Sequence, residues 1–247
     1  MKQAQTTRLY FMPSSGDAKG LFRKEEVKFD FFGGFAISQK HKTITSMHKN
    51  IHKLDRNLRV LEVSTKSLDP LGIQLSAFNL KYDDGDRNYC VENIYQSSKV
   101  FKNSEQYKDL LYCSPADAKR DERLKTSGDI IGFNWNNEFW ETEPKTIFYD
   151  WVYLKALEQN RGLHADISRY NAFTDIEFNP KKSINCQARS VAIFVSLYQQ
   201  DRLEQALRSA AAFKKIYSEG SRDYKIISEQ AQKIRQCKPI QKSLPLE

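Results

Sequence analysis

Val91-Glu92-Asn93-Ile94-Tyr95-Gln96-Ser97-Ser98-Lys99-Val100-Phe101 is the stretch around which the rest of the chain is organised. Its spacing predicts a helix, because apolar or small residues recur at i, i+3 and i+7 and would form one buried face. The residues of that predicted face are Val91, Ile94, Ser98 and Phe101. Glu92 and Lys99 are seven residues apart, about two helical turns, so their side chains would leave the same edge of the helix.

Tyr95 and Gln96 fall between that pair, so a carboxylate, a phenol, an amide and an amine would share one edge of an otherwise apolar helix. Such a set can bring proton-transfer and nucleophilic groups to one small substrate. A plainer interpretation is a solvated Glu and Lys that flank a buried face. Spacing alone favours the plainer interpretation, because charged flanks are the norm for helices.

Four segments, in the same order along the chain, resemble the motif pattern of the NADAR (YbiA-like) family. Glu92 to Lys99 resembles the family's Glu-(His/Asn)-x-Tyr-Gln-x-x-Lys signature, and Leu75-Ser76-Ala77-Phe78-Asn79-Leu80 its Leu-Ser-Asn-Phe-Tyr segment. Pro115-Ala116-Asp117-Ala118-Lys119 is similar to its Pro-x-x-Ala-Lys segment. Asp175, Asn185 and Arg189 resemble its closing Asp...Asn...Arg element. The resemblance covers roughly residues 70 to 200.

Further segments resemble the antitoxin branch of that family, which is associated with DarT-type DNA ADP-ribosyltransferases. These segments are Glu62 to Ser67 leading into Leu71-Gly72, Gly132 to Asn136, Glu143 to Thr146, and Phe178 to Asn185. The resemblance implies hydrolysis of an N-glycosidic bond that joins a ribose to an amine. For this branch it implies removal of ADP-ribose from guanine in DNA, which would reverse the toxin's modification. The expected partners are ADP-ribosylated DNA, ADP-ribose and a DarT-type toxin encoded nearby.

The expected catalytic residues are Glu92, Lys99 and Asp175. Glu92 would shuttle a proton, and Lys99 as a free amine would attack C1 of the ribose to form a Schiff base. The resemblance also implies a lysine imine. Asp175 would bind ribose hydroxyls or assist proton transfer, and Arg189 would hold a phosphate or brace Asp175.

The expected substrate-binding residues come from the motifs and from two neighbouring segments. They are Ser76, Asn79, Tyr95, Gln96, Lys119, Trp135, Lys181, Ser183, Asn185 and Arg189. A helix N-terminus beside Lys181 and Lys182 is typical of a phosphate site. Residues 128–141 predict an aromatic and amide-rich loop. Trp135 there would either stack on a base or anchor the loop.

Composition limits the class of protein. The chain of 247 residues carries a net charge of +8, which favours a polyanionic partner without identifying one. No apolar run approaches the roughly 20 residues of a membrane span, and none near the N-terminus reads as a signal peptide, so we expect a cytoplasmic protein. Four scattered cysteines predict reduced thiols rather than disulfides or a zinc site.

We expect no cofactor and no metal. His48 and His52 have the i, i+4 spacing of a metal pair, but Lys49 stands where a zinc-protease helix has its Glu. Surface histidines on a basic helix are the preferred interpretation. Contact of that helix with DNA phosphates or with the toxin is a weaker alternative.

The expected fold class is α+β, a mainly helical NADAR/YbiA-like domain with a small β-containing N-terminal lobe. We divide the chain into a strand and helix lobe over 1–68, a catalytic domain over 69–235 and a loose tail over 236–247. In the lobe, strands are predicted at 8–12, 24–32 and 59–64 and a helix at 38–54. Further helices are predicted at 115–125, 146–157, 187–198 and 203–216.

Two other functions stay open. A non-enzymatic antitoxin that sequesters DNA or the toxin would not need Glu92 or Lys99. An N-glycosidase of a small ribosylamino metabolite would keep this pair but would not need the basic first seventy residues.

Overall fold

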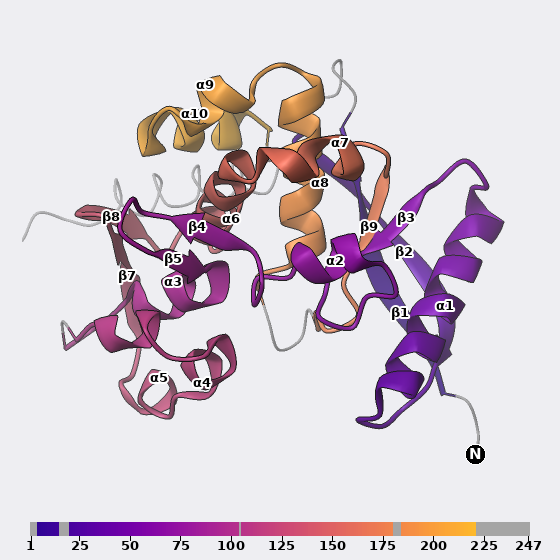
Figure 1. Cartoon of the computed structure of the whole chain (residues 1–247), viewed down its shortest axis with the longest axis horizontal. Helices are drawn as coiled ribbons and strands as arrows, with labels where there is room; N and C mark the ends of the chain where they lie inside the picture. Colours follow the sequence, from indigo (N-terminus) through magenta and orange to yellow (C-terminus); the bar gives the residue numbers. More distant parts are fainter. Residues whose placement is uncertain (1–3, 15–19, 104, 180–183, 221–247) are drawn as a thin grey trace, which may run out of the picture.

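A mixed sheet of four strands occupies one half of the molecule (Figure 1). The computed structural model describes residues 4–14, 20–103, 105–179 and 184–220. The sheet has the order β2-β1-β9-β3, in which β1 (Ala4–Pro13) and β2 (Phe22–Phe31) form a long antiparallel hairpin. β9 (Ala172–Thr174) lies antiparallel to β1 and parallel to β3 (Val60–Glu62). The sheet therefore joins strands from both segments into which the sequence was divided, and the boundary at residue 68 stays a prediction.

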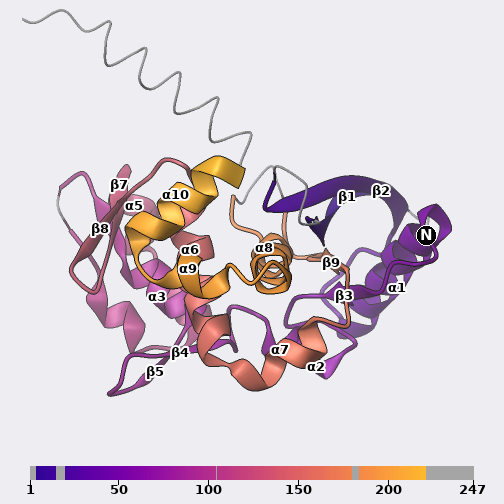
Figure 2. The same ribbon diagram turned by 90° about the horizontal axis from the view of Figure 1, so that it is seen from above.

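Each face of this sheet is covered by one long helix (Figure 2). Side chains alternate along a strand, so Tyr10 and Met12 pack with Met47 of α1 (Ile37–Leu54), while Phe11 joins the core on the opposite face. That second core contains α8 (Gln187–Gln199). Strands and the helix of the N-terminal lobe thus lie where alternation and helical spacing predicted them.

The other half of the molecule is built around α6 (Ile147–Gln159), which is buried nearly all round, as its apolar sequence predicted. Two small antiparallel sheets lie beside it: β4 (Lys81–Asp83) with β5 (Asn88–Cys90), and β6 (Lys99–Phe101) with β7 (Ile130–Trp135) and β8 (Glu138–Glu141). The remaining helices are α2 (Pro70–Gln74), α3 (Val91–Ser97), α4 (Pro115–Arg120), α5 (Arg123–Thr126), α7 (His164–Ile167), α9 (Leu203–Leu207) and α10 (Ala210–Gly220), with short 3-10 turns at Lys108–Leu111 and Arg161–Leu163. The α+β class is confirmed.

The predicted helix over 91–101 is wrong in its second half. α3 ends at Ser97, and Lys99 begins β6, which pairs with β7 in the register Lys99↔Phe133. The hydroxyls of Ser97 and Ser98 both donate to the carbonyl of Ile94, at 3.1 and 2.6 Å. Side-chain bonds of this kind compete with the helical ladder, and pairing with β7 decides the conformation that follows.

Residues 128–141 form a hairpin and not the predicted loop. Asn136 and Asn137 have φ angles of 51° and 60°, between the paired residues Trp135 and Glu138. Two consecutive left-handed residues make the type I′ turn that suits the twist of a hairpin, and Asn tolerates this conformation.

Two predicted helices are each divided. The helix expected over 115–125 breaks at Asp121, whose carboxylate accepts the Arg123 N–H at 2.9 Å in a local turn. The helix expected over 203–216 breaks before Ser209, whose hydroxyl accepts the Ala212 N–H at 3.1 Å and so caps the start of α10. No helix in the described part of the chain has the length and apolar character needed to cross a membrane. The predicted tail over 236–247 lies outside the described residues.

Candidate active site

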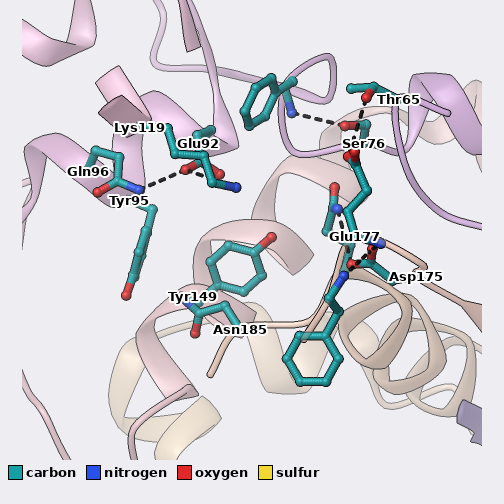
Figure 3. A pocket seen from close by; sticks show the side chains of 13 residues that line it. Thr65, Ser76, Glu92, Tyr95, Gln96, Lys119, Tyr149, Asp175, Glu177 and Asn185 are labelled. Carbon is teal, nitrogen blue, oxygen red and sulfur yellow. Dashed lines mark hydrogen bonds and ion pairs between the residues drawn. The ribbon is translucent and has the colours of Figure 1, made fainter. Parts of the chain in front are cut away.

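A polar cavity of about 620 Å³ lies where α3, α4 and α6 face the segment that connects β9 to α8 (Figure 3). Its lining residues are Thr65, Ser76, Phe78, Glu92, Tyr95, Gln96, Lys119, Tyr149, Asp175, Glu177, Phe178, Asn185 and Gln187. All four segments that resemble the NADAR motif pattern therefore contribute residues to one cavity. Pro115 to Lys119 contributes only its last residue.

Glu92 is held in one wall of this cavity by the first turn of α3. Its backbone N–H donates to the Ala77 carbonyl at 3.0 Å, and the residue is 5% exposed. Gln96, one turn later, donates its amide to Glu92 Oε1 at 2.7 Å. Lys119 of α4 places its Nζ 3.9 Å from the same oxygen and is itself well exposed. α3 thus presents a buried carboxylate beside the exposed cation of α4.

Lys99 lies behind the wall and is not among the residues that line the cavity. Its Nζ lies 5.1 Å from the centre of the Tyr95 ring, which does line the cavity. Burial lowers the pKa of Lys99 to about 8, although the Glu92 carboxylate raises it and Lys119 lowers it further. The strand position of Lys99 therefore produces an amine that loses its proton near neutral pH.

Tyr95 separates this amine from the cavity. Its ring packs against Phe133 at 5.3 Å and meets the edge of Tyr149 at 5.3 Å. Burial raises the pKa of Tyr95 to about 12, against the effect of a hydrogen bond with Asn185. The phenol is neutral at physiological pH and can serve as a hydrogen-bonding group of the site.

Asp175 occupies the wall opposite Glu92 (Figure 3). Its carboxylate accepts the backbone N–H groups of Glu177 and Phe178, each at 3.0 Å, and the side-chain amide of Gln187 at 3.2 Å. Burial raises the pKa of Asp175 to about 6, in spite of these hydrogen bonds. A carboxyl group of this kind can hold or release a proton close to neutrality.

Arg189 does not brace Asp175. Its guanidinium contacts Asp150 of α6 at 3.0 and 3.1 Å, and Asp150 also accepts the hydroxyls of Ser190 and Tyr217. Arg189 does not line the cavity, so the structure gives it a place in a buried network that joins α6, α8 and α10. Spacing along the sequence could not distinguish Asp150 from Asp175, because both are separated from Arg189 by long stretches of chain.

The other predicted binding residues divide into three groups. Ser76, Gln96, Lys119 and Asn185 line the cavity together with Tyr95. Asn79 is exposed and donates to the Ile73 carbonyl at 2.8 Å, and Trp135 packs against Tyr82 beside two other cavities, so neither belongs to this one. Lys181 and Ser183 lie outside the described residues.

Six lining residues were not predicted from the sequence: Thr65, Phe78, Tyr149, Glu177, Phe178 and Gln187. Thr65, Phe78 and Phe178 lie within the segments that carry the family resemblance, and this was a usable signal. Tyr149 reads as one more apolar residue of a buried helix, so no local pattern identifies it.

His48 and His52 of α1 contact different partners, and no group of three or more His, Cys, Asp or Glu suited to a metal occurs among the described residues. His52 is exposed, as predicted, and contacts the Leu58 carbonyl at 2.8 Å. The prediction of a surface position is wrong for His48, which is partly buried with its Nε2 2.9 Å from the Thr174 hydroxyl. Cys90, Cys113 and Cys186 are free thiols, and Cys237 lies outside the described residues.

A family model described as DarT1-associated NADAR antitoxin matches residues 6–226. No curated protein matches the chain significantly. The matched range includes the four-stranded sheet as well as every described residue that lines the cavity. On this match, the chain belongs to the family of DarT1-associated NADAR antitoxins.

Proposed function

We propose that this antitoxin is a glycosidase that hydrolyses the N-glycosidic bond of ADP-ribosylated guanine in DNA, and so reverses the modification made by a DarT-type toxin. The observation that carries the proposal is the convergence of three groups: the buried Glu92 carboxylate, the Asp175 carboxyl on the opposite wall, and the Lys99 amine behind Tyr95. An acid, a base and a nucleophile are what cleavage of a glycosylamine requires. The free thiols agree with a cytoplasmic protein.

The proposed reaction runs through an imine. A ribose joined to the exocyclic amine of guanine opens its ring when the ring oxygen gains a proton, which leaves C1 doubly bonded to nitrogen. The neutral Lys99 amine adds to C1, and Glu92 carries a proton from the lysine nitrogen to the guanine nitrogen. The bond between C1 and guanine then breaks. Water hydrolyses the resulting lysine imine, which releases ADP-ribose and restores the amine.

Lys99 must move to reach the substrate. Its four-carbon stem is flexible, and catalytic contacts are often long in a site that holds no substrate. The aromatic rings of Phe78 and Phe178 line the cavity and offer faces on which a base can stack. Asp175 would accept hydrogen bonds from ribose hydroxyls, and Lys119 offers a cation for the pyrophosphate.

The test is release of ADP-ribose from an oligonucleotide that carries ADP-ribosylated guanine. Glu92→Gln and Lys99→Ala should each reduce release at least about a thousandfold, because each removes a group that acts on the reacting atoms. Borohydride should trap a covalent adduct with the intact protein and none with Lys99→Ala. Lys214→Ala is the matched control, since the Lys214 amine also lies over an aromatic ring, 4.4 Å from the centre of Trp140, away from the cavity.

The outcomes separate the alternatives. Retained protection of cells by both variants would contradict the enzyme and favour an antitoxin that acts by sequestration. Release from a modified nucleoside but not from DNA would favour hydrolysis of a small metabolite.

A further inference from the structure

Glu62 lies directly behind the wall of the cavity and contacts the residues on both sides of Asp175. It is the last residue of β3 and is 1% exposed. Its Oε2 accepts the Thr174 hydroxyl at 2.6 Å, and its Oε1 accepts the Ile176 N–H at 2.9 Å. One buried carboxylate therefore holds the chain immediately before and immediately after the predicted catalytic carboxyl group.

His48 of α1 fixes the direction of these hydrogen bonds. Its Nε2 lies 2.9 Å from the Thr174 hydroxyl, which has one proton and donates it to Glu62. An ionised Glu62 can only accept, so in that state His48 is the donor to Thr174. Burial lowers the pKa of His48 to about 4, so the ring is neutral. A directed chain from His48 through Thr174 to Glu62 thus joins the helix on the outer face of the sheet to the active-site wall.

The backbone around Glu62 is held equally firmly. The Val63 N–H donates to the Thr174 carbonyl at 2.8 Å, which extends the parallel pairing of β3 with β9. A Cβ atom on Gly72 would lie 1.9 Å from the Glu62 carbonyl oxygen, so α2 packs directly on the Glu62 backbone. Glu62 cannot shift without moving two other elements.

A buried carboxylate next to a second one costs stability, since both lose hydration and repel each other. An apolar residue would fill this position in the sheet at lower cost. Glu62 is thus placed where it weakens the fold but orders one short segment. That segment is the one that presents Asp175.

We propose that Glu62, with Thr174 and His48 behind it, is the positioning residue for Asp175, which it holds at the angle needed to face Glu92 across the cavity. The part given to Asp175 in catalysis rests on the proposed function. The positioning itself does not.

Hydrogen exchange tests the positioning without any substrate. The N–H groups of Glu177 and Phe178 bond to Asp175 and not to Glu62, so their exchange reports whether Asp175 has moved. Glu62→Ala should speed their exchange at least about tenfold. Glu62→Gln should leave it within about threefold, because Oε1 still accepts from Ile176 while the new amide donates to Thr174, whose hydroxyl then turns to His48. Glu25→Ala is the matched control, since Glu25 accepts the Tyr10 hydroxyl at 2.6 Å in the same sheet.

Activity supplies the second readout. Glu62→Ala should lower kcat for ADP-ribose release about 10- to 100-fold with KM nearly unchanged, and Glu62→Gln should restore most of kcat at pH 7.5. If Glu62→Ala does not fold, Thr174→Val removes one of the two links and should speed exchange at the same N–H groups. Unchanged exchange in the folded variants would overturn the positioning. Faster exchange with unchanged kcat would uphold the positioning and overturn the part given to Asp175 in catalysis. No release by the intact protein would overturn the proposed glycosidase instead, and exchange would still decide the role of Glu62.

Discussion

At the scale of the residue, the most consequential feature is the amine of Lys99. A lysine on a solvated helix keeps its proton far above physiological pH, whereas this one is partly buried against Tyr95 at the start of β6. The lowered pKa, about 8, leaves a useful fraction of neutral amine at pH 7.5. Nucleophilic attack on C1 needs that neutral form.

The rate of ADP-ribose release should therefore rise with pH. Between pH 6.5 and 7.5 the neutral fraction of Lys99 grows about eightfold, and it levels off above its pKa of about 8. Asp175, with a pKa raised to about 6, is already mostly ionised in that range and adds little to the slope. Single-turnover rates from pH 6.5 to 9 would measure this dependence. A flat profile with rate-limiting chemistry would contradict a lysine nucleophile.

Glu62 makes the stability of the protein depend on pH in a specific direction. Burial, followed by repulsion from Asp175, raises the pKa of Glu62 to about 7, above its value in the unfolded chain. The folded state then binds this proton more tightly than the unfolded chain does. The resulting contribution of Glu62 to the free energy of unfolding is full below about pH 4 and is lost as pH rises through about 7. Glu62→Gln has no such loss. The Tm of Glu62→Gln minus that of the wild type should thus increase between pH 5 and pH 8. The increase should be about 2–4 °C for each kcal/mol of unfolding free energy that the wild type loses over this range.

Thermal unfolding at several pH values, followed by circular dichroism, checks this prediction. Glu25→Gln provides the control, because it makes the same chemical change at a glutamate of the same sheet whose side chain bonds to Tyr10. A Glu62→Gln difference that falls with increasing pH would mean that the pKa of Glu62 is lowered, and not raised, in the folded protein.

At the scale of the element, sequence predicted local structure well and long-range pairing poorly. Alternation in β2 and apolar character in α6 were sufficient to identify both elements. The break after Ser97 was missed because β6 exists only through its pairing with β7, about thirty residues later. The same limit applies to the site: Glu62 begins a segment that carries the family resemblance, but its contacts come from the neighbouring strand β9, and the segment itself does not predict them.

The hairpin of β7 and β8 therefore supports the position of Lys99, and Gly132 is its tightest point. A Cβ atom there would lie 2.2 Å from the Phe139 ring and 2.6 Å from the Trp140 carbonyl oxygen. Gly132 pairs with Val100, next to Lys99. Gly132→Ala should cost about 1–3 kcal/mol and lower kcat by displacing β6. Chemical unfolding and borohydride trapping would measure the two effects.

Gly162→Ala is the control for this substitution, since a Cβ atom at Gly162 meets nothing within 4 Å. It should leave both stability and trapping close to wild type. Full activity of Gly132→Ala would show that the hairpin can adjust without moving Lys99.

At the scale of the whole molecule, the net charge of +8 can attract DNA only through basic side chains that are exposed on the surface. Lys42, Lys49 and Lys53 are exposed on α1, at the end of the molecule formed by the four-stranded sheet (Figure 1). The family match extends over this half, so the sheet and α1 belong to the unit that the family model describes and not to an appended segment. A surface of lysines suits contact with DNA phosphates, which adds affinity without reading sequence.

Replacing these three lysines by Gln should raise KM for a modified oligonucleotide and leave KM for a modified nucleoside unchanged. For each phosphate that α1 no longer neutralises, the plot of the logarithm of the DNA association constant against the logarithm of salt concentration should become shallower in slope by about 0.7–0.9. Lys81, Lys102 and Lys125 are exposed on other parts of the chain, and their replacement by Gln removes the same net charge. Equal effects of the two triple variants would mean that overall charge, and not α1, attracts the DNA. No salt dependence for either substrate would favour a small metabolite, because hydrolysis in the cavity alone needs no contact with a nucleic-acid backbone.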